Sequence, residues 1–333
     1  MTDGLPMARL GRTTVEVTRL GLGTAPLGGL YAPVEAADAE ATIAAAWDLG
    51  IRYFDTAPLY GFGLAERRLG AFLRGKPRQS FVVSTKVGRL LRRPADGEAT
   101  SDPFYKGTPP ERPVFDFSHD GVLRSLEESL ARLGLDRVDI LLIHDPDDHH
   151  DAAMAGAYRA LDRLRRDGTI GALGAGMNQS AMLTRFAGEG TFDGFLLAGR
   201  YSLLDQGALA DLLPACVRHG VGLIVGGVYN SGVIADPMRN AKFDYRDADA
   251  ATLNRLAGID AVCRRHGVPV KAAAMQFPGG HPAVTCVLSG ARSAAEITEN
   301  VAMFRYPVPA ALWRELRAEG LIAEAAPTPE APP

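Results

Sequence analysis

Short apolar segments alternate with longer amphipathic segments along almost the whole chain of 333 residues. The apolar residues within each short segment are continuous, which is typical of strands that are buried on both faces. The candidate strands are residues 19–24, 51–55, 81–86, 138–144, 170–176, 192–198, 221–227 and 283–290. Most are followed by a candidate helix, including 38–50, 120–134, 154–168 and 207–220. Eight strands in this alternation predict an α/β fold of the (β/α)8 or TIM-barrel type.

A doubly wound nucleotide-binding fold has the same alternation and is the competing interpretation. Its glycine fingerprint is incomplete here, because "GLGTAPLGG" has Gly21 and Gly23 but Pro26 at the third required position. The barrel is therefore favoured. No linker-like segment divides the chain, so residues 1–322 are predicted to form one domain. Residues 323–333, "AEAAPTPEAPP", are rich in Pro, Ala and Glu and are predicted to be a disordered tail.

The composition indicates which partners the protein could bind and in which cellular compartment it is found. The formal charge of -3 and the lack of a basic stripe argue against nucleic-acid binding, and the run "RLLRR" at 89–93 is interpreted as a solvated loop. No apolar segment reaches about 18 residues, so no membrane association is expected. The three cysteines stand far apart in sequence, which suits a reducing, cytoplasmic location. A monomer and a small homo-oligomer both remain open.

Polar residues terminate three consecutive candidate strands. Asp55, Lys86 and His144 each follow an apolar run, and Tyr60 lies in the loop just beyond Asp55. For any one of these residues alone, a structural role is a simpler interpretation than a catalytic role. In a barrel, however, the C-terminal ends of the strands meet at one mouth, where active sites form. We therefore expect these four side chains to converge.

The chemistry of the four side chains is complementary. A free tyrosine has a pKa of about 10 and exchanges protons poorly near neutrality, whereas an adjacent ammonium favours the phenolate. A carboxylate beside the lysine would hold it charged and oriented, and a histidine would orient a carbonyl or hydroxyl oxygen. Together these groups predict proton transfer at a carbonyl or alcohol oxygen, which is the partner reaction of hydride transfer.

The segment "HDPDDHHD" at 144–151 is rich in possible metal ligands. Of its histidines, only His144 ends a candidate strand. His149 and His150 are adjacent in sequence and would point in different directions, whereas a catalytic metal usually gathers three ligands around an open position. We therefore expect no metal site, and a solvated loop after His144.

Several motifs, taken together, resemble the aldo-keto reductase family over residues 8–305. They are "GLGTAPLG", "FDTAPLYGFGLAERRLG", "VVSTK", "DILLIHDPD", "GALGAGMN" and "VLSGARSAAEITEN". The resemblance implies a TIM barrel with a C-terminal helix, and an N-terminal β-hairpin in "RLGRTTVEVTRLG" that closes its bottom. It also implies a nicotinamide cofactor extended across the barrel mouth.

The resemblance also implies a role for each matching residue. Tyr60 would be the general acid/base, Lys86 and Asp55 its modulators, and His144 the residue that orients the substrate oxygen. The residues implied in cofactor binding are Thr24, Asn178, Gly227, Asn230, Ser231, Gly232, Arg292, Glu296 and Asn300. Glu296 replaces an arginine that often binds the 2′-phosphate of NADP, so NAD is expected to be preferred, with NADP possible. Three further positions depart from the family pattern: Met177, Ala198 and Gly226.

Within the family, "LLIHDPDDHH", "AGRYSLLDQ" and "GGVYNSGVI" most resemble the sugar-oxidising aldose 1-dehydrogenases. The implied reaction is oxidation of L-fucose, L-galactose or D-arabinose at C1 to the lactone. A pyridoxal 4-dehydrogenase and a broad aldehyde or ketone reductase are the alternatives. A non-catalytic channel subunit is disfavoured, because all four positions of the tetrad are present.

The loop 87–117 follows Lys86 and is long for a connection within a compact domain. Long loops of this kind are often functional. Its aromatic residues are expected either to wall the substrate site or to belong to a surface crossover; they are Phe104, Tyr105, Phe115 and Phe117.

Overall fold

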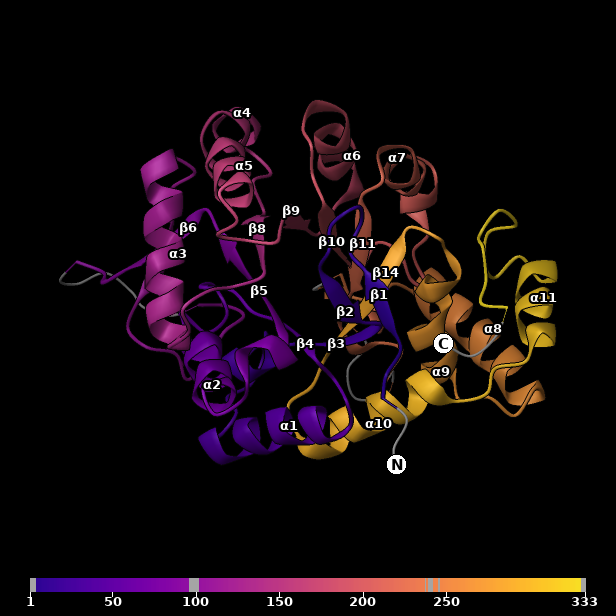
Figure 1. Cartoon of the computed structure of the whole chain (residues 1–333). Helices are drawn as coiled ribbons and strands as arrows, with labels where there is room; N and C mark the ends of the chain where they lie inside the picture. Colours follow the sequence, from indigo (N-terminus) through magenta and orange to yellow (C-terminus); the bar gives the residue numbers. More distant parts are fainter. Residues whose placement is uncertain (1–3, 96–101, 237, 239–241, 245, 331–333) are drawn as a thin grey trace.

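The computed structural model describes residues 4–95, 102–236, 238, 242–244 and 246–330. Eight parallel strands close into a barrel, which confirms the predicted fold class (Figure 1). Each observed strand lies within or overlaps its predicted segment. In the order in which they pair around the barrel, the strands are β3 (Leu20–Gly23), β4 (Tyr53–Asp55), β5 (Val82–Val87), β8 (Ile140–His144), β9 (Ala172–Met177), β10 (Gly194–Ala198), β11 (Gly222–Gly226) and β14 (Val284–Gly290).

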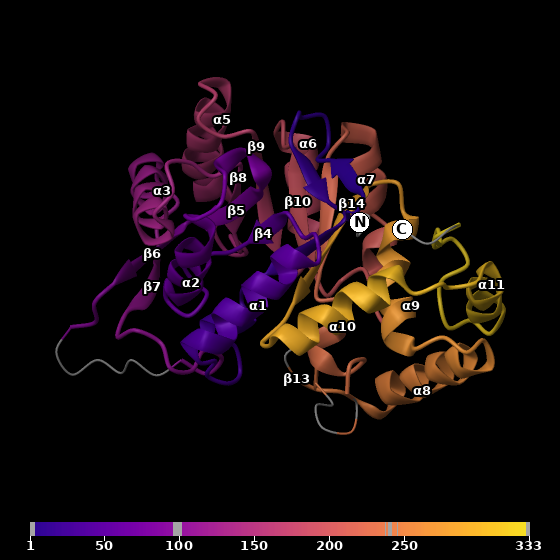
Figure 2. The same cartoon turned by 60° about the horizontal axis from the view of Figure 1, so that its bottom comes forward.

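Helices surround this barrel, and α10 runs beside α1 across one side of it (Figures 1 and 2). The predicted helix at 154–168 begins as a π-helical turn, Ala153–Tyr158, before it continues as α5. The helices are α1 (Ala36–Asp48), α2 (Leu64–Leu73), α3 (His119–Leu133), α4 (His150–Ala152), α5 (Arg159–Arg166), α6 (Ser180–Glu189), α7 (Leu212–His219), α8 (Ala250–Arg265), α9 (Val270–Gln276), α10 (Ala294–Arg305) and α11 (Ala310–Ala318).

Two apolar clusters hold the architecture together. The larger one fills the layer between barrel and helices, and the smaller one fills the barrel interior. Helix α3 contributes Val122, Leu126 and Leu133 to the larger cluster, as its three- and four-residue spacing predicts. Leu123 in the same helix is 37% exposed, because it falls one position outside the buried face.

The N-terminal hairpin consists of β1 (Met7–Arg9) and β2 (Glu16–Thr18), which pair antiparallel. Leu10 and Val17 on this hairpin are fully buried in the same cluster as the residues of the barrel interior. Gly11 packs against the backbone of Asp193 and Gly220, at the N-terminal ends of β10 and β11. The hairpin therefore closes the end of the barrel opposite the mouth, as the family resemblance implies.

The loop 87–117 folds back on itself as a two-stranded ribbon. β6 (Arg89–Arg92) pairs antiparallel with β7 (Arg112–Phe115), while residues 96–101 lie outside the described part of the chain. Leu90 and Leu91 are 4% and 6% exposed. The interpretation of 89–93 as a solvated loop is thus wrong, because the two adjacent leucines are buried and anchor residues 89–92 as a strand.

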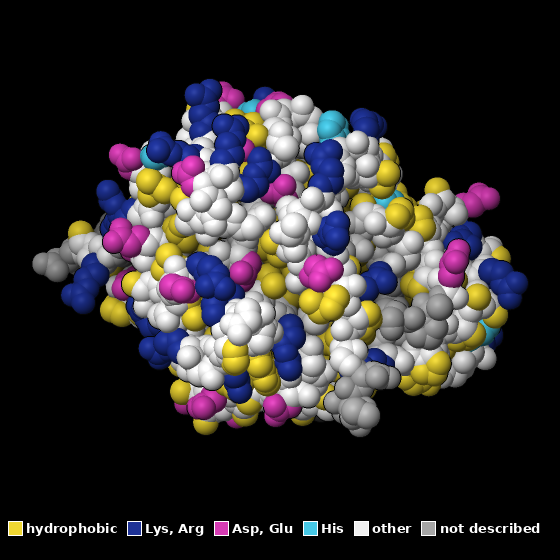
Figure 3. Space-filling model, viewed as in Figure 1, with side chains coloured by type: hydrophobic (Ala, Val, Ile, Leu, Met, Phe, Trp, Pro, Cys, Tyr) yellow, Lys and Arg dark blue, Asp and Glu magenta, His cyan; other side chains and the backbone are white. Residues whose placement is uncertain are grey.

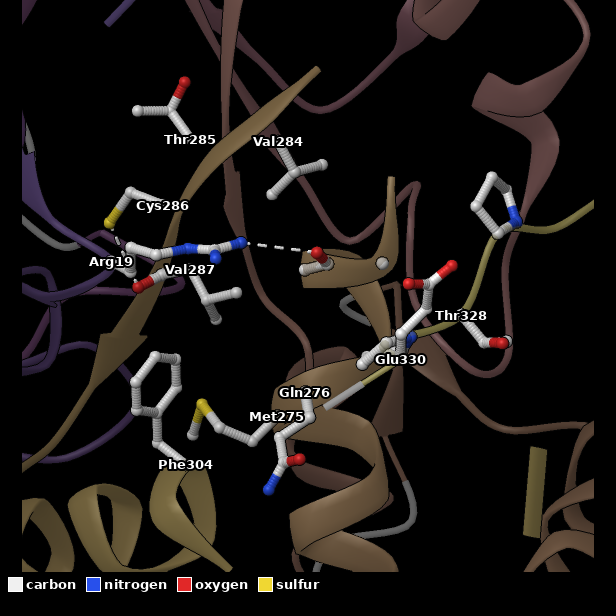
Figure 4. A pocket seen from close by; sticks show the side chains of 14 residues that line it. Arg19, Met275, Gln276, Val284, Thr285, Cys286, Val287, Phe304, Thr328 and Glu330 are labelled. Atoms are coloured by element: carbon white, nitrogen blue, oxygen red, sulfur yellow. Dashed lines mark hydrogen bonds between the residues drawn. The ribbon is translucent and has the colours of Figure 1, made fainter. Parts of the chain in front are cut away.

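The C-terminal segment differs from the predicted disordered tail over residues 323–330. Ala326 is 1% exposed, and its carbonyl accepts a hydrogen bond from Nη2 of Arg317 at 3.0 Å. Residues 327–330 wall a cavity of about 450 Å³ together with Arg19, Gln276 and Cys286 (Figure 4). This cavity lies beside the N-terminal half of β14 and therefore away from the barrel mouth. Residues 331–333 lie outside the described part.

The molecular surface mixes charges of both signs, as the face drawn in Figure 3 shows. No helix in the described ranges is both long and apolar enough to cross a membrane.

Candidate active site

A buried ion pair joins the ends of β4 and β5. Nζ of Lys86 lies 2.6 Å from Oδ2 of Asp55, and both side chains are 1% exposed. The same ammonium donates a hydrogen bond to the carbonyl of Thr56 at 3.0 Å. Burial of a charged side chain costs desolvation free energy, and buried charges are therefore found paired and hydrogen-bonded. The Lys86 side chain is therefore fixed in position at the barrel mouth.

Two hydroxyl groups extend this pair into the barrel interior. Oγ of Ser84 donates to Oδ1 of Asp55 at 2.6 Å, and the hydroxyl of Tyr53 lies 2.9 Å from Oγ of Ser84. Since the single hydrogen of Ser84 is used on the carboxylate, Tyr53 donates to Ser84. Burial and the nearby charge of Asp55 raise the pKa of Tyr53 well above its ordinary value, so it remains a donor. Both oxygens of Asp55 are thus held.

Tyr60 and His144 complete the predicted group of four. Nζ of Lys86 lies 4.5 Å from the centroid of the Tyr60 ring. The rings of Tyr60 and His144 meet edge to face, with centroids 5.8 Å apart and planes at 88°. The four side chains therefore lie together at the barrel mouth, as expected.

The side chain of His144 is 7% exposed. Its burial, followed by the positive charges of Arg89 and Lys86, lowers its pKa well below the ordinary value. The ring is therefore neutral at physiological pH, with one nitrogen that donates and one that accepts. Nδ1 is buried and has no hydrogen-bond partner among the described residues, whereas Nε2 lies 3.5 Å from Oδ2 of Asp145.

A cavity of about 440 Å³ opens above these side chains. Tyr60, Lys86 and His144 lie at its reactive end, and Arg89, Asp145 and Asn178 add polar groups. The remaining lining is mainly apolar and aromatic, and includes Leu30, Leu59, Phe104, Tyr105, Met177 and Leu196. Such a mixture suits a small molecule that has both polar and apolar faces.

The aromatic residues of the 87–117 loop divide into two groups. Phe104 and Tyr105 line the cavity, as the prediction of a substrate wall requires. Phe115 and Phe117 do not; they stack on each other and contact the ring of His149. The first alternative, a wall of the cavity, therefore applies to Phe104 and Tyr105, and the second, a crossover outside it, to Phe115 and Phe117.

Three further cavities continue from the first one toward the N-terminus of α10. They have volumes of about 220, 230 and 820 Å³, and neighbouring ones share lining residues. Tyr60 lies at one end of this groove and Asn300 at the other. A long groove that ends at a helix N-terminus suits an extended ligand carrying phosphates, because helix N-termini attract anions. The residues present therefore fit a dinucleotide.

Most of the residues implied in cofactor binding line these cavities. In the loop after β11, Asn230 and Ser231 adopt positive φ angles of 47° and 58°. The side chain of Asn230 accepts a hydrogen bond from Ser202 and donates one to the carbonyl of Gly199, and these two bonds fix the shape of the loop. The hydroxyl of Thr24 is buried and donates to the carbonyl of Asp55 at 3.0 Å, and its place near the cofactor stays a prediction.

At the far end of the groove, Arg292 and Glu296 are joined locally. The backbone N–H of Arg292 donates to Oε2 of Glu296 at 2.8 Å, and both side chains are 47% exposed. Asn300 is 5% exposed and donates to the carbonyl of Gly290 at 3.2 Å. All three residues line the largest of the cavities.

The three positions that depart from the family pattern all lie at the mouth. Ala198 and Gly226 are partners across β10 and β11, and both line the cavity next to Tyr60. A methyl group built on Gly226 would meet no atom closer than 3.8 Å. Small residues therefore leave this part of the floor open, and the buried Met177 supplies an apolar surface beside it.

The three histidines of residues 144–151 lie in different surroundings. His144 faces the mouth, His149 packs on Phe115 and Phe117, and His150 pairs with Glu189 at 2.7 Å. Within the described ranges, no group of three or more His, Cys, Asp or Glu side chains is placed to hold a metal ion.

Comparison with known proteins agrees with this fold. The family model described as "Aldo/keto reductase family" matches residues 19–318. A pyridoxal 4-dehydrogenase from Microbacterium luteolum is 45% identical, with 94% of this chain and 97% of the relative covered. A D-threo-aldose 1-dehydrogenase from a Pseudomonas species is 43% identical, with 94% and 96% covered. Among solved structures, the holo form of an aldo-keto reductase from Bacillus halodurans superposes with a TM-score of 0.76 at 23% identity, covering 97% of this chain and 98% of the other.

The chain belongs to the aldo/keto reductase family. It is an oxidoreductase, and enzymes of this family use nicotinamide cofactors, which the long groove fits.

Proposed function

We propose that the enzyme oxidises the hemiacetal carbon of a small aldose to the lactone, with Tyr60 as the general acid/base. The observation that carries this proposal is the placement of one buried ammonium, held by Asp55, 4.5 Å from the Tyr60 ring and beside a neutral His144. The substrate class is supported by 43% identity to a D-threo-aldose 1-dehydrogenase.

The four side chains divide the proton chemistry between them. The positive charge of Lys86 stabilises the phenolate of Tyr60, which takes the proton from the hydroxyl on the reacting carbon. Asp55 holds the Lys86 side chain in place. His144 binds the reacting oxygen through a ring nitrogen and, being neutral, adds no competing charge. A bound nicotinamide supplies the hydride acceptor.

Oxidation of pyridoxal is the second candidate, because the relative at 45% identity is a pyridoxal 4-dehydrogenase. The aromatic wall formed by Tyr105 and Phe104 suits a flat ring as well as the apolar face of a sugar. In both reactions a cyclic hemiacetal gives a lactone, so the same four residues serve either substrate. A broad aldehyde or ketone reductase would use them in the opposite direction.

For the cofactor, we propose that NAD is preferred and NADP tolerated. Glu296 places a carboxylate at the far end of the groove, where it would repel a 2′-phosphate and accept hydrogen bonds from ribose hydroxyls. Arg292 lies beside it and would offset part of that repulsion. A Glu296→Arg variant is expected to raise the NADP/NAD ratio of kcat/KM; an unchanged ratio would contradict this assignment.

The deciding assay is NAD reduction by the purified enzyme with L-fucose, L-galactose, D-arabinose and pyridoxal, each repeated with NADP. Fast turnover of the sugars supports the aldose proposal, and turnover confined to pyridoxal supports the second candidate. Reduction of generic aldehydes without oxidation of any of the four compounds would overturn both and favour the broad reductase.

The Tyr60→Phe variant tests the acid/base assignment. It removes the group that exchanges the proton, so kcat is expected to fall by a factor of about 100 to 10,000. Cofactor binding, followed by quenching of protein fluorescence, should survive. Tyr158→Phe is the matched control, because the Tyr158 hydroxyl accepts a hydrogen bond from the backbone of Thr191, outside the site. Near-normal turnover by Tyr60→Phe would reject the assignment.

A cytoplasmic location stays a prediction, to which the three free, buried cysteines add support. The choice between a monomer and a small homo-oligomer also stays open to measurement, for example by light scattering.

A further inference from the structure

A second ion pair lies at the barrel mouth, and the proton chemistry proposed above does not use it. Nη2 of Arg89 lies 2.9 Å from Oδ2 of Asp145, and the two side chains are 16% and 17% exposed. Both residues line the 440 Å³ cavity beside Tyr60 and His144. Burying a charged pair in a substrate-sized cavity costs desolvation energy, and hydrogen bonds to a bound ligand would offset part of that cost.

The fold holds both partners firmly. Asp145 follows directly after β8 with a φ angle of 42°, and its backbone N–H donates to the carbonyl of Gly176 at 3.0 Å. Arg89 is the first residue of β6, and its guanidinium lies over the Phe115 ring at 4.7 Å. The ribbon formed by β6 and β7 thus places the guanidinium of Arg89 next to the carboxylate of Asp145, just after β8.

The pair offers hydrogen-bond acceptors and donors side by side. A carboxylate accepts, and a guanidinium donates through several N–H groups in a fixed plane. Nε of Arg89 is buried and has no hydrogen-bond partner among the described residues. A hydroxyl group, which both donates and accepts, is the neutral group that suits such a combination.

The pair is adjacent to the place where the reacting oxygen would bind. Oδ2 of Asp145 lies 3.5 Å from Nε2 of His144. An oxygen held by His144 therefore has the carboxylate beside it, and the next polar group of the substrate would fall within reach of Asp145 and Arg89. Elsewhere in the cavity lining, Leu30 is apolar, and Oδ1 of Asp102 accepts hydrogen bonds from the backbone N–H groups of residues 104 and 105.

We propose that Arg89 and Asp145 form a subsite for the hydroxyl group on the carbon next to the reacting carbon. The enzyme would then select 2-hydroxylated substrates, which include the aldoses, over analogues without that hydroxyl. This inference rests on the proposed placement of the reacting oxygen at His144, and it refines the substrate class of the same site. Removal of one partner would leave the other charge and the substrate hydroxyl poorly paired.

The test compares two matched pairs of substrates in wild type, Asp145→Asn, Arg89→Met and Arg89→Lys. The first pair is D-arabinose and 2-deoxy-D-ribose, followed in the oxidative direction. The second pair is lactaldehyde and propanal, which differ only in the 2-hydroxyl; it is followed in the reductive direction, which does not depend on lactone formation. For each enzyme, the quantity compared is the kcat/KM ratio of the hydroxylated to the unhydroxylated compound.

Wild type is expected to favour the hydroxylated member of each pair. Asp145→Asn and Arg89→Met should lower that ratio by about 10- to 100-fold, the size expected for a hydrogen bond to a charged group. Arg89→Lys keeps the charge and should lose less. Asp148→Asn is the control, because this exposed carboxylate lies three residues further along the same loop and should leave the ratio unchanged.

The two proposals fail in different ways. If sugars are oxidised but both ratios are the same in wild type and Asp145→Asn, the subsite is wrong and the proposed function stands. If no sugar is oxidised but the lactaldehyde/propanal ratio falls in Asp145→Asn, the subsite stands and the aldose proposal is wrong. A wild-type enzyme without preference for either hydroxylated compound would also overturn the subsite.

Discussion

Ser84 is the residue that holds the free oxygen of the buried carboxylate. Asp55 uses Oδ2 for Lys86 and Oδ1 for Ser84, and Tyr53 in turn donates to Ser84. The position of the ammonium beside the Tyr60 ring therefore depends on two side chains that never reach the substrate cavity. We infer that they act as positioning residues through Asp55.

A Ser84→Ala variant tests this positioning role. It leaves Oδ1 of Asp55 and the hydroxyl of Tyr53 without their partner, so we expect a loss of about 1–3 kcal/mol in the free energy of unfolding. A kcat about tenfold lower and a shifted pH profile should accompany that loss, because Lys86 is held less well. The measurements are denaturant unfolding and the pH dependence of kcat.

Thr85→Val is the matched control for that variant. The hydroxyl of Thr85 is equally buried, but it points to the other face of β5 and donates to Glu66 at 2.8 Å. This variant should lose stability and keep the wild-type pH profile. Equal catalytic effects in both variants would mean that Ser84 acts through general stability alone.

Asp145 makes stability depend on pH in a direction unusual for a carboxyl group. Burial raises its pKa from 3.8 to about 6, although the charges of Arg89 and Lys86 oppose the shift and Asp147 adds to it. The folded chain therefore binds this proton more tightly than the unfolded chain. The resulting stability is present below pH about 4 and is lost as the pH rises through about 6.

The expected result is a pH-dependent difference between wild type and Asp145→Asn. The unfolding free energy of wild type relative to the variant should decrease between pH about 4 and 6 and level off above that range. Urea unfolding at fixed ionic strength measures it. A difference that increases with pH over this interval would show that the carboxyl has a lowered pKa instead, as an ion pair that dominated desolvation would produce.

At the scale of elements, the ends of strands were predictable and the contacts between loops were not. Asp55, Lys86 and His144 interrupt apolar runs, so their place at the mouth followed from the strand pattern. Arg89 and Asp145 carry no comparable signal, because each meets its partner only after the β6–β7 ribbon folds back over β8. Ser84 had a signal that we did not use: it lies two residues before Lys86, on the same face of β5.

The loop between β4 and α2 is where backbone fit controls the site. Gly61, next to Tyr60, has a φ angle of 61°, and a methyl group built on it would lie 2.1 Å from the carbonyl oxygen of Gly28. A Gly61→Ala variant must therefore move this loop and Tyr60 with it. We expect kcat/KM to fall at least tenfold, along with a loss of about 1–3 kcal/mol in stability.

Gly168→Ala separates the strain of a positive φ angle from the displacement of the loop. Gly168 has a φ angle of 74°, and its added methyl group would meet no atom within 4 Å. This variant should lose about 1 kcal/mol of stability and retain wild-type kcat/KM. If Gly61→Ala behaves in the same way as Gly168→Ala, the contact with Gly28 does not position Tyr60.

For the whole molecule, the barrel was predictable because its signal is repeated along the chain. Continuous apolar strands such as 138–144 and helices such as 120–134 recur at regular intervals. The apolar pattern within each segment indicates which of its residues are buried. The C-terminal segment has no such repeat. Ala326 is buried by helix α11 and neighbouring loops that its own Pro- and Ala-rich sequence does not reveal, so composition alone suggested disorder.

The C-terminal segment and the active site lie at different places on the barrel, and this separation gives the last prediction. A chain that stops at residue 323 loses the burial of Ala326 and the hydrogen bond from Arg317, and it opens the cavity beside β14. We expect a loss of about 1–3 kcal/mol in stability with kcat/KM unchanged, since the mouth is built from the C-terminal ends of the strands. Thermal unfolding and NAD reduction measure the two effects, and a chain that stops at residue 330 is the control. An unchanged melting temperature would mean that residues 324–330 do not pack on the barrel in solution, and a lower kcat/KM at full folding would mean that the two ends are coupled.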